Sequence, residues 1–232
     1  MPHAPDQTAP QDGSPNTAIA CLGDSITAGV ADEEGLGWVA RLSQKLAARQ
    51  PNHYLVYNCG VSGDTTTQAW HNLLGHVTHL NPQVLIIALG VNDILEAASK
   101  GENKAGNMPR VSPIDRFVNW LRIFEYTGKM GWRTLVLGPL PVAGEELVFP
   151  VGPEDGFASM FSTFSFSNAA IKEYNIGLKA FCDSQHVPFL DVTDVWQQSA
   201  VELYTDGLHP NAAGHRLLAT QIFDKLVQLK YV

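Results

Sequence analysis

Two residues near the C-terminus have the types and the spacing that catalysis by a histidine needs. Asp206 and His209 stand three positions apart in the segment YTDGLHPNAAGH, residues 204–215. The residues Asp-Gly-Leu-His are typical of a β-turn, in which Gly207 supplies conformational freedom and Pro210 restricts His209 to extended conformations. Because a turn brings its first and fourth residues together, we expect the carboxylate to reach the near ring nitrogen of His209. A carboxylate in that place orients the imidazole and stabilises its positive charge when the ring takes a proton.

Polar or small residues also follow three expected strands. They are Ser25 in CLGDSITAGV, Gly60 in NCGVSGDTT, and Asn92 and Asp93 in ALGVNDIL. A parallel sheet gathers the carboxyl ends of its strands at one edge, where ligands of such folds bind. The sequence therefore predicts that these stretches meet the Asp206–His209 turn at that edge.

The chemical types of these residues fit acyl transfer. That reaction needs a nucleophile, a base, a group that orients the base, and donors directed at a developing oxyanion. Ser25 is the predicted nucleophile, His209 the base that takes its proton, and Asp206 the residue that holds the imidazole. The backbone N–H groups of Ser25 and Gly60 and the side-chain amide of Asn92 are the predicted oxyanion hole. Gly60 suits a place where backbone must approach a ligand closely.

The elements that must position these groups alternate between short apolar runs and longer helical patterns. The expected strands are Ala18–Leu22, Tyr54–Tyr57, Val84–Leu89, Thr134–Leu137 and Val187–Leu190. The expected helices are about Gly37–Arg49, Thr66–Leu80, Ile114–Thr127, Asn168–Ser184 and Ala212–Leu229. Apolar runs without alternation indicate strands that are covered on both faces. The pattern predicts a three-layer α/β/α sandwich around a five-stranded parallel sheet.

The organisation of the chain indicates one domain. We expect Met1–Thr17, a polar stretch with four prolines, to be a flexible tail, and residues 18–232 to form a single catalytic domain. Two long segments that follow strands, Glu96–Pro113 and Gly138–Phe166, show no clear regular pattern and are expected to be irregular and to line a site. In the second segment, crowded apolar residues predict either a loop that covers the core or a wall of an acyl pocket beside Ser25.

Composition excludes several classes of function. The 232 residues carry a formal net charge of −8 and no Lys- or Arg-rich run, so we expect neither nucleic acid nor an anionic membrane as a partner. The longest apolar run, Val84–Leu89, is far too short to cross a bilayer. The first basic residue is Arg41, which argues against a signal peptide. Cys21, Cys59 and Cys182 lack metal-ligand spacing, and Cys21 and Cys59 are expected in the core. We expect a cytoplasmic protein.

Four short blocks make the chain similar to a known family. GDSIT, the glycine of NCGVSGDTT, GVND and DGLH resemble, in order, the four blocks of the SGNH (GDSL) hydrolases. The resemblance spans residues 18–232 and implies a flavodoxin-like sandwich, no metal or other cofactor, and an esterase or lipase mechanism with a Ser-His-Asp triad. Residue by residue it implies Ser25, Gly60, Asn92 and His209, with Asp206 three positions before the histidine. The serine block differs from the G-x-S-x-G elbow of α/β-hydrolases, which disfavours that fold.

The substrate implied is a small-molecule carboxylic ester, cleaved through an acyl-enzyme. A thioesterase, a lysophospholipase and a sugar-acetyl esterase are alternatives on the same triad, and a non-catalytic binding protein of this fold is another. Asp191 and Asp194 compete with Asp206 as the acid of the triad. A metal site formed by Asp206, His209 and His215 is a rival hypothesis, although it assigns no function to Ser25.

Three more acidic residues near the blocks are expected to have structural roles. Asp24 and Asp93 are adjacent to expected catalytic positions and are predicted to brace their loops through hydrogen bonds to backbone. Asp64 is predicted to cap the helix that begins near Thr65.

Overall fold

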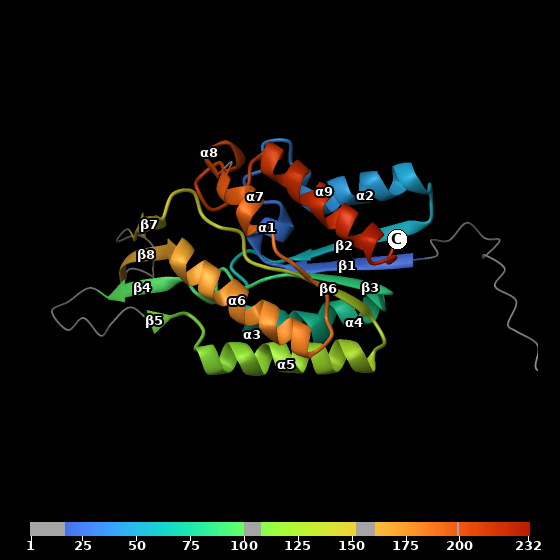
Figure 1. The fold of residues 1–232 in the computed structure, drawn as a ribbon, viewed down its shortest axis with the longest axis horizontal. Coiled ribbons are helices and arrows are strands. Elements are labelled where there is room, and N and C mark those ends of the chain that lie inside the picture. The colour runs from blue at the N-terminus through green and yellow to red at the C-terminus, as the bar shows by residue number, and fades with distance from the viewer. Residues whose placement is uncertain (1–16, 100–107, 152–160, 199) are drawn as a thin grey trace, which may run out of the picture.

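A parallel sheet of five strands forms the centre of the molecule (Figure 1). The computed structural model describes residues 17–99, 108–151, 161–198 and 200–232. The strands lie in the order β2-β1-β3-β6-β9. They are β1 (Thr17–Gly23), β2 (Tyr54–Gly60), β3 (Val84–Ala88), β6 (Arg133–Leu137) and β9 (Phe189–Leu190). The predicted five-stranded sheet is confirmed, and its order is that of flavodoxin-like folds, whose ligands bind where the strand order reverses, between β1 and β3.

The inner strands are apolar on both faces because helices cover both. In β1, Ile19 and Cys21 pack in one core while Ala20 and Leu22 pack in the other, and all four side chains are fully buried. The edge strand β2 differs, since Leu55 is 40% exposed. The expectation that all five strands are buried is therefore wrong for this strand and for β9, which is only half-buried, because each edge strand has a sheet neighbour on one side only.

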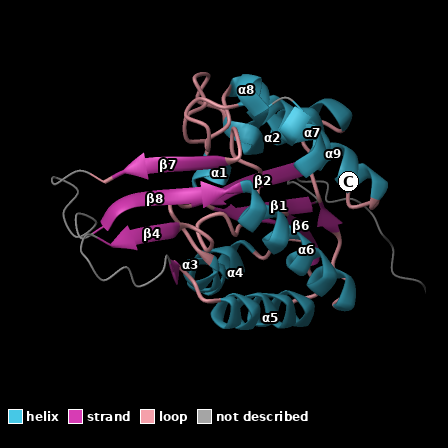
Figure 2. Cartoon of the chain, turned by 60° about the vertical axis from the view of Figure 1, so that its left-hand side comes forward, coloured by secondary structure: helices cyan, strands magenta, loops and turns pink. Residues whose placement is uncertain are grey.

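Helices form the outer two layers (Figures 1 and 2). On one side of the sheet lie α1 (Ser25–Ala28), α2 (Gly37–Arg49), α7 (Thr193–Gln198), α8 (Ala200–Leu203) and α9 (Ala212–Gln228). On the other lie α3 (Thr66–Asn72), the π-helical η1 (Leu73–Val77), α4 (Thr78–Leu80), α5 (Pro113–Lys129) and α6 (Asn168–Ser184). The predicted three-layer sandwich is confirmed.

Three of the long helices begin at capping residues that the sequence contains. Ser112, Ser167 and Asn211 accept hydrogen bonds from backbone N–H groups of the first turns of α5, α6 and α9. Such caps satisfy N–H groups for which a helix has no internal partner. The caps therefore fix where these helices start relative to the strand ends.

A second sheet of four antiparallel strands lies beyond the carboxyl ends of the parallel strands (Figures 1 and 2). In the order β5-β4-β8-β7 it contains β5 (Met108–Pro109), β4 (Glu96–Ser99), β8 (Phe161–Ser167) and β7 (Glu146–Pro150). The expectation that Glu96–Pro113 and Gly138–Phe166 are irregular is wrong. Each segment is a pair of strands, and β4 pairs with β8, so the two segments stabilise each other across a long sequence separation.

Some predicted segments include residues that the structure does not describe. Residues 1–16 of the expected tail are outside the described ranges, whereas Thr17 already belongs to β1. Residues 100–107 and 152–160 of the two segments also lie outside. Within the described ranges, no helix is long and apolar enough to cross a membrane. Cys21 is buried as expected, while Cys59 on the edge strand is only partly so, and both thiols are free.

Candidate active site

Ser25 is the first residue of α1, a single turn of helix directly after β1. The Oδ1 atom of Asp24 accepts the N–H of Ile26 at 3.0 Å, which starts the turn. Gly29 ends it with a φ of 91°, a conformation that glycine adopts without strain. Ser25 itself is 8% exposed. Because a helix supplies no acceptor for its first N–H groups, the backbone N–H of Ser25 is not needed by α1.

The turn from Asp206 to His209 is closed by the Asp206 side chain. Its Oδ1 atom accepts the backbone N–H of Leu208 at 3.0 Å and that of His209 at 2.7 Å. Gly207 has a φ of 89°, which explains the glycine at this position. The first and fourth residues are thereby held together, as expected for a β-turn.

Asp206, His209 and Ser25 form a continuous chain of hydrogen bonds. The second carboxylate oxygen of Asp206, Oδ2, lies 2.7 Å from His209 Nδ1, and His209 Nε2 lies 3.0 Å from Ser25 Oγ. Since an ionised carboxylate can only accept, Nδ1 carries the proton and Nε2 is left to accept from the serine hydroxyl. The structure thus brings Ser25 and His209 into hydrogen-bonding contact although they are 184 positions apart in the sequence.

The charge of Asp206 is favoured by its surroundings. Partial burial by itself raises the pKa of this carboxyl, but hydrogen bonds from the backbone and the ring of His209 and from the backbone of Leu208 outweigh it, so the pKa is lowered overall. A carboxylate that accepts several hydrogen bonds stays ionised. The residue that faces Nδ1 is therefore an anion at neutral pH.

Other segments anchor this turn. Thr205 Oγ1 donates to the carbonyl of Ala31 at 3.0 Å, which links the turn to the loop after α1. The N–H of Ala143 donates to the carbonyl of Gly207 at 2.8 Å. The side chain of Leu147, on β7, lies so close to Gly207 that an added Cβ would be 3.1 Å from its Cδ1 atom. The second sheet therefore packs directly on the turn that holds His209.

Gly60 lies at the end of β2, next to the turn of helix that carries Ser25. A Cβ at this position would be 2.3 Å from the backbone nitrogen of Ala28, so only glycine lets β2 approach α1. The structure thus gives a different reason for the glycine from the close approach to a ligand that the sequence indicates. The N–H of Gly60 donates to Oδ1 of Asn58 at 2.9 Å. Asn58 was not singled out in the sequence, although an Asn two residues before a glycine is a turn signal.

Asn92 follows β3 and is 8% exposed. Within the described ranges, its side-chain nitrogen donates one hydrogen bond, to the carbonyl of Asp64 at 3.0 Å. An amide NH₂ group has two donors, so the second N–H remains for another acceptor. The loop is fixed by the next residue, Asp93, whose carboxylate accepts the N–H of Thr66 at 2.8 Å and the hydroxyl of Tyr174 at 3.2 Å.

The competing acids lie elsewhere. Asp191 accepts the N–H of Thr193 at 2.9 Å, and Asp194 stands in the first turn of α7. Of the three acids considered, Asp206 is the one that contacts His209. The expected cap at Asp64 is wrong, since Thr65 caps α3 together with Gln68. The Gln68 side chain accepts the N–H of Thr65 at 3.1 Å, and the N–H of Thr66, the first residue of the helix, is accepted by Asp93 rather than by Asp64.

His215 is separate from these contacts. Its side chain is fully buried in α9, where the backbone of Val30 lies next to the ring. Both ring nitrogens of His209 are engaged, one by Asp206 and one by Ser25. Across the described ranges, no group of three or more His, Cys, Asp or Glu side chains is arranged to hold a metal ion.

Asp24 is the most perturbed carboxyl next to these residues. Complete burial raises its pKa, and the neighbouring carboxylates of Asp64 and Asp93 raise it further, against a hydrogen bond from Ile26, so that the pKa reaches about 7. The carboxyl group next to Ser25 is therefore a much weaker acid than an ordinary aspartate.

Comparison with known proteins supplies independent information. A model of the GDSL-like Lipase/Acylhydrolase family matches residues 21–217. Esterase TesA of Pseudomonas aeruginosa is 33% identical over 84 residues, which are 36% of this chain and 41% of that protein. The matched part is thus about two fifths of the esterase.

Two solved structures have the same fold. An acetyl xylan esterase, AlAXEase, aligns with a TM-score of 0.66 and 19% identity over 90% of this chain and 99% of that one. A lipase/acylhydrolase from Enterococcus faecalis aligns with a TM-score of 0.63 and 22% identity over 90% and 95%. At these identities the similarity concerns the fold.

Proposed function

Because the chain belongs to the GDSL-like lipase/acylhydrolase family, we propose that it hydrolyses carboxylic esters with Ser25 as the nucleophile. The observation that carries this proposal is the chain of hydrogen bonds from Asp206 through His209 to Ser25, with distances of 2.7 and 3.0 Å. A nucleophile, a base and an orienting acid in this sequence of contacts are the machinery of serine hydrolysis.

In the first half-reaction, Ser25 Oγ attacks the carbonyl carbon of the ester while His209 Nε2 takes the hydroxyl proton. The imidazolium is stabilised by the carboxylate of Asp206 at Nδ1, whose lowered pKa keeps it charged. The tetrahedral intermediate then collapses. The bond to the alkoxy oxygen breaks, His209 gives its proton to the leaving alcohol, and the acyl group stays on Ser25.

In the second half-reaction, water takes the place of the alcohol. His209 Nε2 accepts a proton from the water as the water oxygen attacks the acyl carbon, and the bond to Ser25 Oγ then breaks. Ser25 recovers its proton from His209, and the carboxylic acid leaves. The same three side chains thus serve both halves of the reaction.

The oxyanion of each tetrahedral intermediate needs donors that are already in place. We assign these to the N–H of Ser25, the N–H of Gly60 and the free N–H of the Asn92 amide. The N–H of Gly60 is bonded to Asn58 Oδ1 in this structure. When substrate binds, this N–H has to donate to the oxyanion as well as to Asn58, or the bond to Asn58 has to break. The first two donors lie on backbone segments that the Gly60–Ala28 contact holds together.

Several acyl substrates are compatible with this apparatus. Small acyl esters are the primary proposal. The fold similarity to an acetyl xylan esterase makes acetylated sugars a class to include, and acyl thioesters and lysophospholipids are alternatives on the same triad. A binding protein that does not catalyse has no use for an activated serine and is the least favoured.

The test is hydrolysis of p-nitrophenyl esters, an acyl thioester and an acetylated xylan by the wild type, Ser25→Ala and Ser62→Ala. Ser62 is an exposed serine near Gly60 and serves as the control. We expect Ser62→Ala to match the wild type and Ser25→Ala to lose on the order of 10⁶ in kcat. Retention of more than about one hundredth of the activity by Ser25→Ala is incompatible with the proposal.

A further inference from the structure

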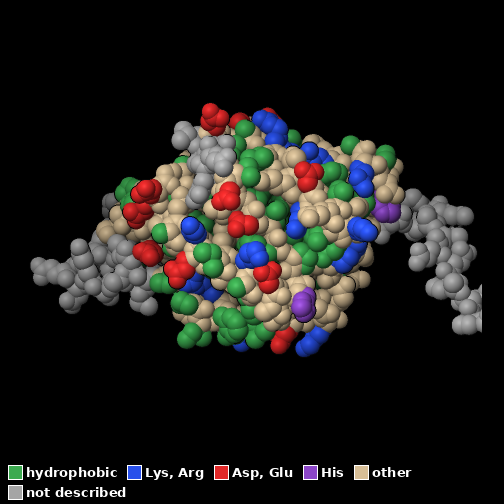
Figure 3. All heavy atoms as spheres, in the orientation of Figure 1, with side chains coloured by type: hydrophobic (Ala, Val, Ile, Leu, Met, Phe, Trp, Pro, Cys, Tyr) green, Lys and Arg blue, Asp and Glu red, His purple; other side chains and the backbone are tan. Residues whose placement is uncertain are grey.

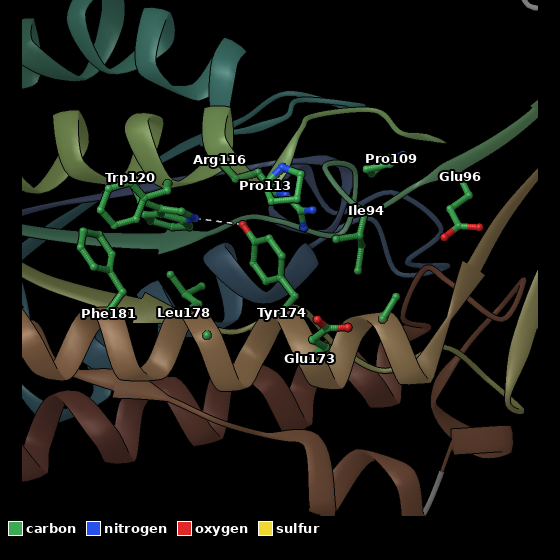
Figure 4. Close-up of a pocket in the computed structure, with 13 residues that line it drawn as sticks. Ile94, Glu96, Pro109, Pro113, Arg116, Trp120, Glu173, Tyr174, Leu178 and Phe181 are labelled. Atoms are coloured by element: carbon green, nitrogen blue, oxygen red, sulfur yellow. Dashed lines mark hydrogen bonds between the residues drawn. The ribbon is translucent and has the colours of Figure 1, made fainter. Parts of the chain in front are cut away.

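A cavity of about 490 Å³ lies between α5 and α6, under β4 and β5, and Ser25, Asp206 and His209 are not among the residues that line it. The volume is in the range that encloses a small organic molecule. Figure 4 shows the cavity with its side chains. None of the residues described so far as nucleophile, base, acid or oxyanion donor faces it.

One end of the cavity is apolar and aromatic. Trp120 from α5 and Leu178 and Phe181 from α6 meet there, as Figure 4 shows. Trp120 is 3% exposed, and its indole N–H is bonded to the Tyr174 hydroxyl at 2.9 Å, so this end offers no polar group from the indole. An apolar part of a ligand gains free energy by displacing water here.

The middle of the cavity carries a positive charge. The guanidinium of Arg116 lies over the ring of Tyr174, 5.3 Å from the centroid. In the part of the chain that the structure describes, no carboxylate lies within ion-pair distance of Arg116, and its buried Nε has no acceptor. Burial raises the pKa of Asp93, which is bonded to the Tyr174 hydroxyl, and the charge of Arg116 partly opposes that rise but does not pair with Asp93. A guanidinium next to an aromatic ring still presents several N–H donors in one plane, which suits a carboxylate.

Two carboxylates also line the cavity, Glu96 at the end away from Trp120 and Glu173 next to Tyr174 (Figure 4). They repel a second negative charge on any ligand whose first charge is bound to Arg116. The charge pattern therefore favours a ligand with a single anionic group over a phosphate or a dicarboxylate.

We propose that this cavity binds a small monocarboxylic acid whose carboxylate pairs with Arg116 and whose apolar tail lies between Trp120, Leu178 and Phe181. The site goes beyond the proposed ester hydrolysis and does not depend on it. Its ligand makes no contact that requires Ser25 or His209.

Gly177 provides a way to fill the cavity. It lies inside the 17-residue helix α6, lines the cavity, and a Cβ there would meet no atom within 4 Å. Glycine in a helix is less favourable than other residues. A Cβ at this exposed position therefore fits without a clash or a weaker helix, and we expect a longer side chain there to extend over the cavity that Gly177 lines.

The experiment is isothermal titration calorimetry with octanoate and, as its uncharged counterpart, octanamide. The proteins are the wild type, Arg116→Gln, Arg122→Gln, Gly177→Leu and Ser25→Ala. Arg122 is an exposed arginine on the same helix and is the matched control. We expect Arg116→Gln to weaken octanoate binding about tenfold or more, since it loses a charged hydrogen-bonded pair. Gly177→Leu should abolish binding, and Arg122→Gln and Ser25→Ala should leave it unchanged.

Octanamide, which is uncharged, distinguishes the contribution of the apolar end of the cavity from that of Arg116. We expect octanamide to bind the wild type more weakly than octanoate does, and to bind Arg116→Gln about as well as the wild type. The proposal is overturned if octanoate does not bind the wild type, or if it binds Arg116→Gln and Gly177→Leu as it binds the wild type. If Ser25→Ala is the one variant that loses octanoate binding, octanoate binds at the serine, and this result also overturns the proposal. Retained helical circular dichroism shows that each variant is folded.

Discussion

The two oxygens of Asp206 act on different parts of the same turn. Oδ1 accepts the N–H groups of Leu208 and His209 and sets the backbone, while Oδ2 holds the imidazole. An asparagine keeps one acceptor oxygen but brings an NH₂ group, so it cannot accept at both places. Nδ1–H then loses its anionic partner, or the ring changes tautomer.

We therefore expect Asp206→Asn to lower kcat by roughly 10²–10⁴, because the imidazolium loses its stabilising charge and the ring its orientation. Asp191→Asn is the control, since Asp191 bonds its own loop at Thr193. Steady-state hydrolysis of p-nitrophenyl butyrate measures both. Normal rates in Asp206→Asn together with a loss in Asp191→Asn would move the acid role to Asp191.

Asn92 holds one amide hydrogen on the Asp64 carbonyl and has the other for an oxyanion. If that hydrogen stabilises charge that develops only in the transition state, Asn92→Ala should lower kcat by roughly 10²–10³ with little change in KM. The kinetic constants of the two enzymes for one ester decide this. A higher KM with an unchanged kcat would make Asn92 a group that only positions the substrate.

Asp24 makes stability depend on pH in an unusual direction. Burial raises the pKa of Asp24 to about 7 in the folded chain, whereas an unfolded Asp ionises near its ordinary value of about 3.9. Between about pH 4 and 7 the folded chain holds a proton that the unfolded chain has released, so this group stabilises the fold at low pH, and that contribution falls as pH rises through this window.

Asp24→Asn should remove this dependence while an amide oxygen still caps Ile26. We expect the free energy of unfolding of the variant, relative to the wild type, to increase from pH 5 to pH 8 by up to about 3 kcal/mol, because about two pH units of the window lie in this interval, at about 1.36 kcal/mol per unit. Urea unfolding at both pH values measures the difference. A constant difference between the two proteins would mean that the pKa of Asp24 is not raised.

At the scale of elements, the second sheet determines how the histidine turn is supported. Strand β7 alternates, with Leu147 directed at Gly207 and Val148 51% exposed on the other face. Leu147 and Val148 are therefore suited to serve as a test position and its control. Both are aliphatic, but Leu147 contacts the turn that carries His209 and Val148 faces solvent.

We expect Leu147→Ala to reduce the preference for longer acyl chains, and Val148→Ala to leave it unchanged. If β7 walls the acyl site, each methylene that is buried contributes up to about 0.8 kcal/mol, close to fourfold in kcat/KM per carbon. Hydrolysis of p-nitrophenyl acetate, butyrate, hexanoate and octanoate gives the preference. Equal chain-length profiles for Leu147→Ala and the wild type would leave the strand with a purely structural role.

At the scale of the whole molecule, local sequence predicts the parallel sheet and its helices well. Helices α2 and α6 have the predicted boundaries, since periodic apolar residues and, for α6, a capping serine lie within the segment itself. The strands that carry Ser25 and Asn92 are apolar runs that only a doubly covered sheet can bury. The placement of the turn that carries His209 follows from the same topology.

The second sheet was missed because its strands are stabilised by distant partners. The residues of β4, Glu-Ala-Ala-Ser, have little intrinsic preference for a strand, and pairing with β8 determines their conformation. In β8, FSTFSFS, the last five residues alternate Phe with Thr or Ser, which was a signal for a strand that the glycines and prolines before it obscured. The contact of Leu147 with Gly207 depends on this sheet and could not be predicted either.

The central claim is that His209 activates Ser25 as a nucleophile, and covalent labelling tests it most directly. The wild type, Ser25→Ala, His209→Ala and Ser62→Ala are treated with a serine-directed alkyl phosphonate, and intact-mass and peptide mass spectra locate the adduct. We expect one adduct, on Ser25, in the wild type and in Ser62→Ala, no adduct in Ser25→Ala, and strongly slowed labelling in His209→Ala because the base is missing. Labelling of another serine, or labelling of Ser25 at the wild-type rate without His209, would contradict the account.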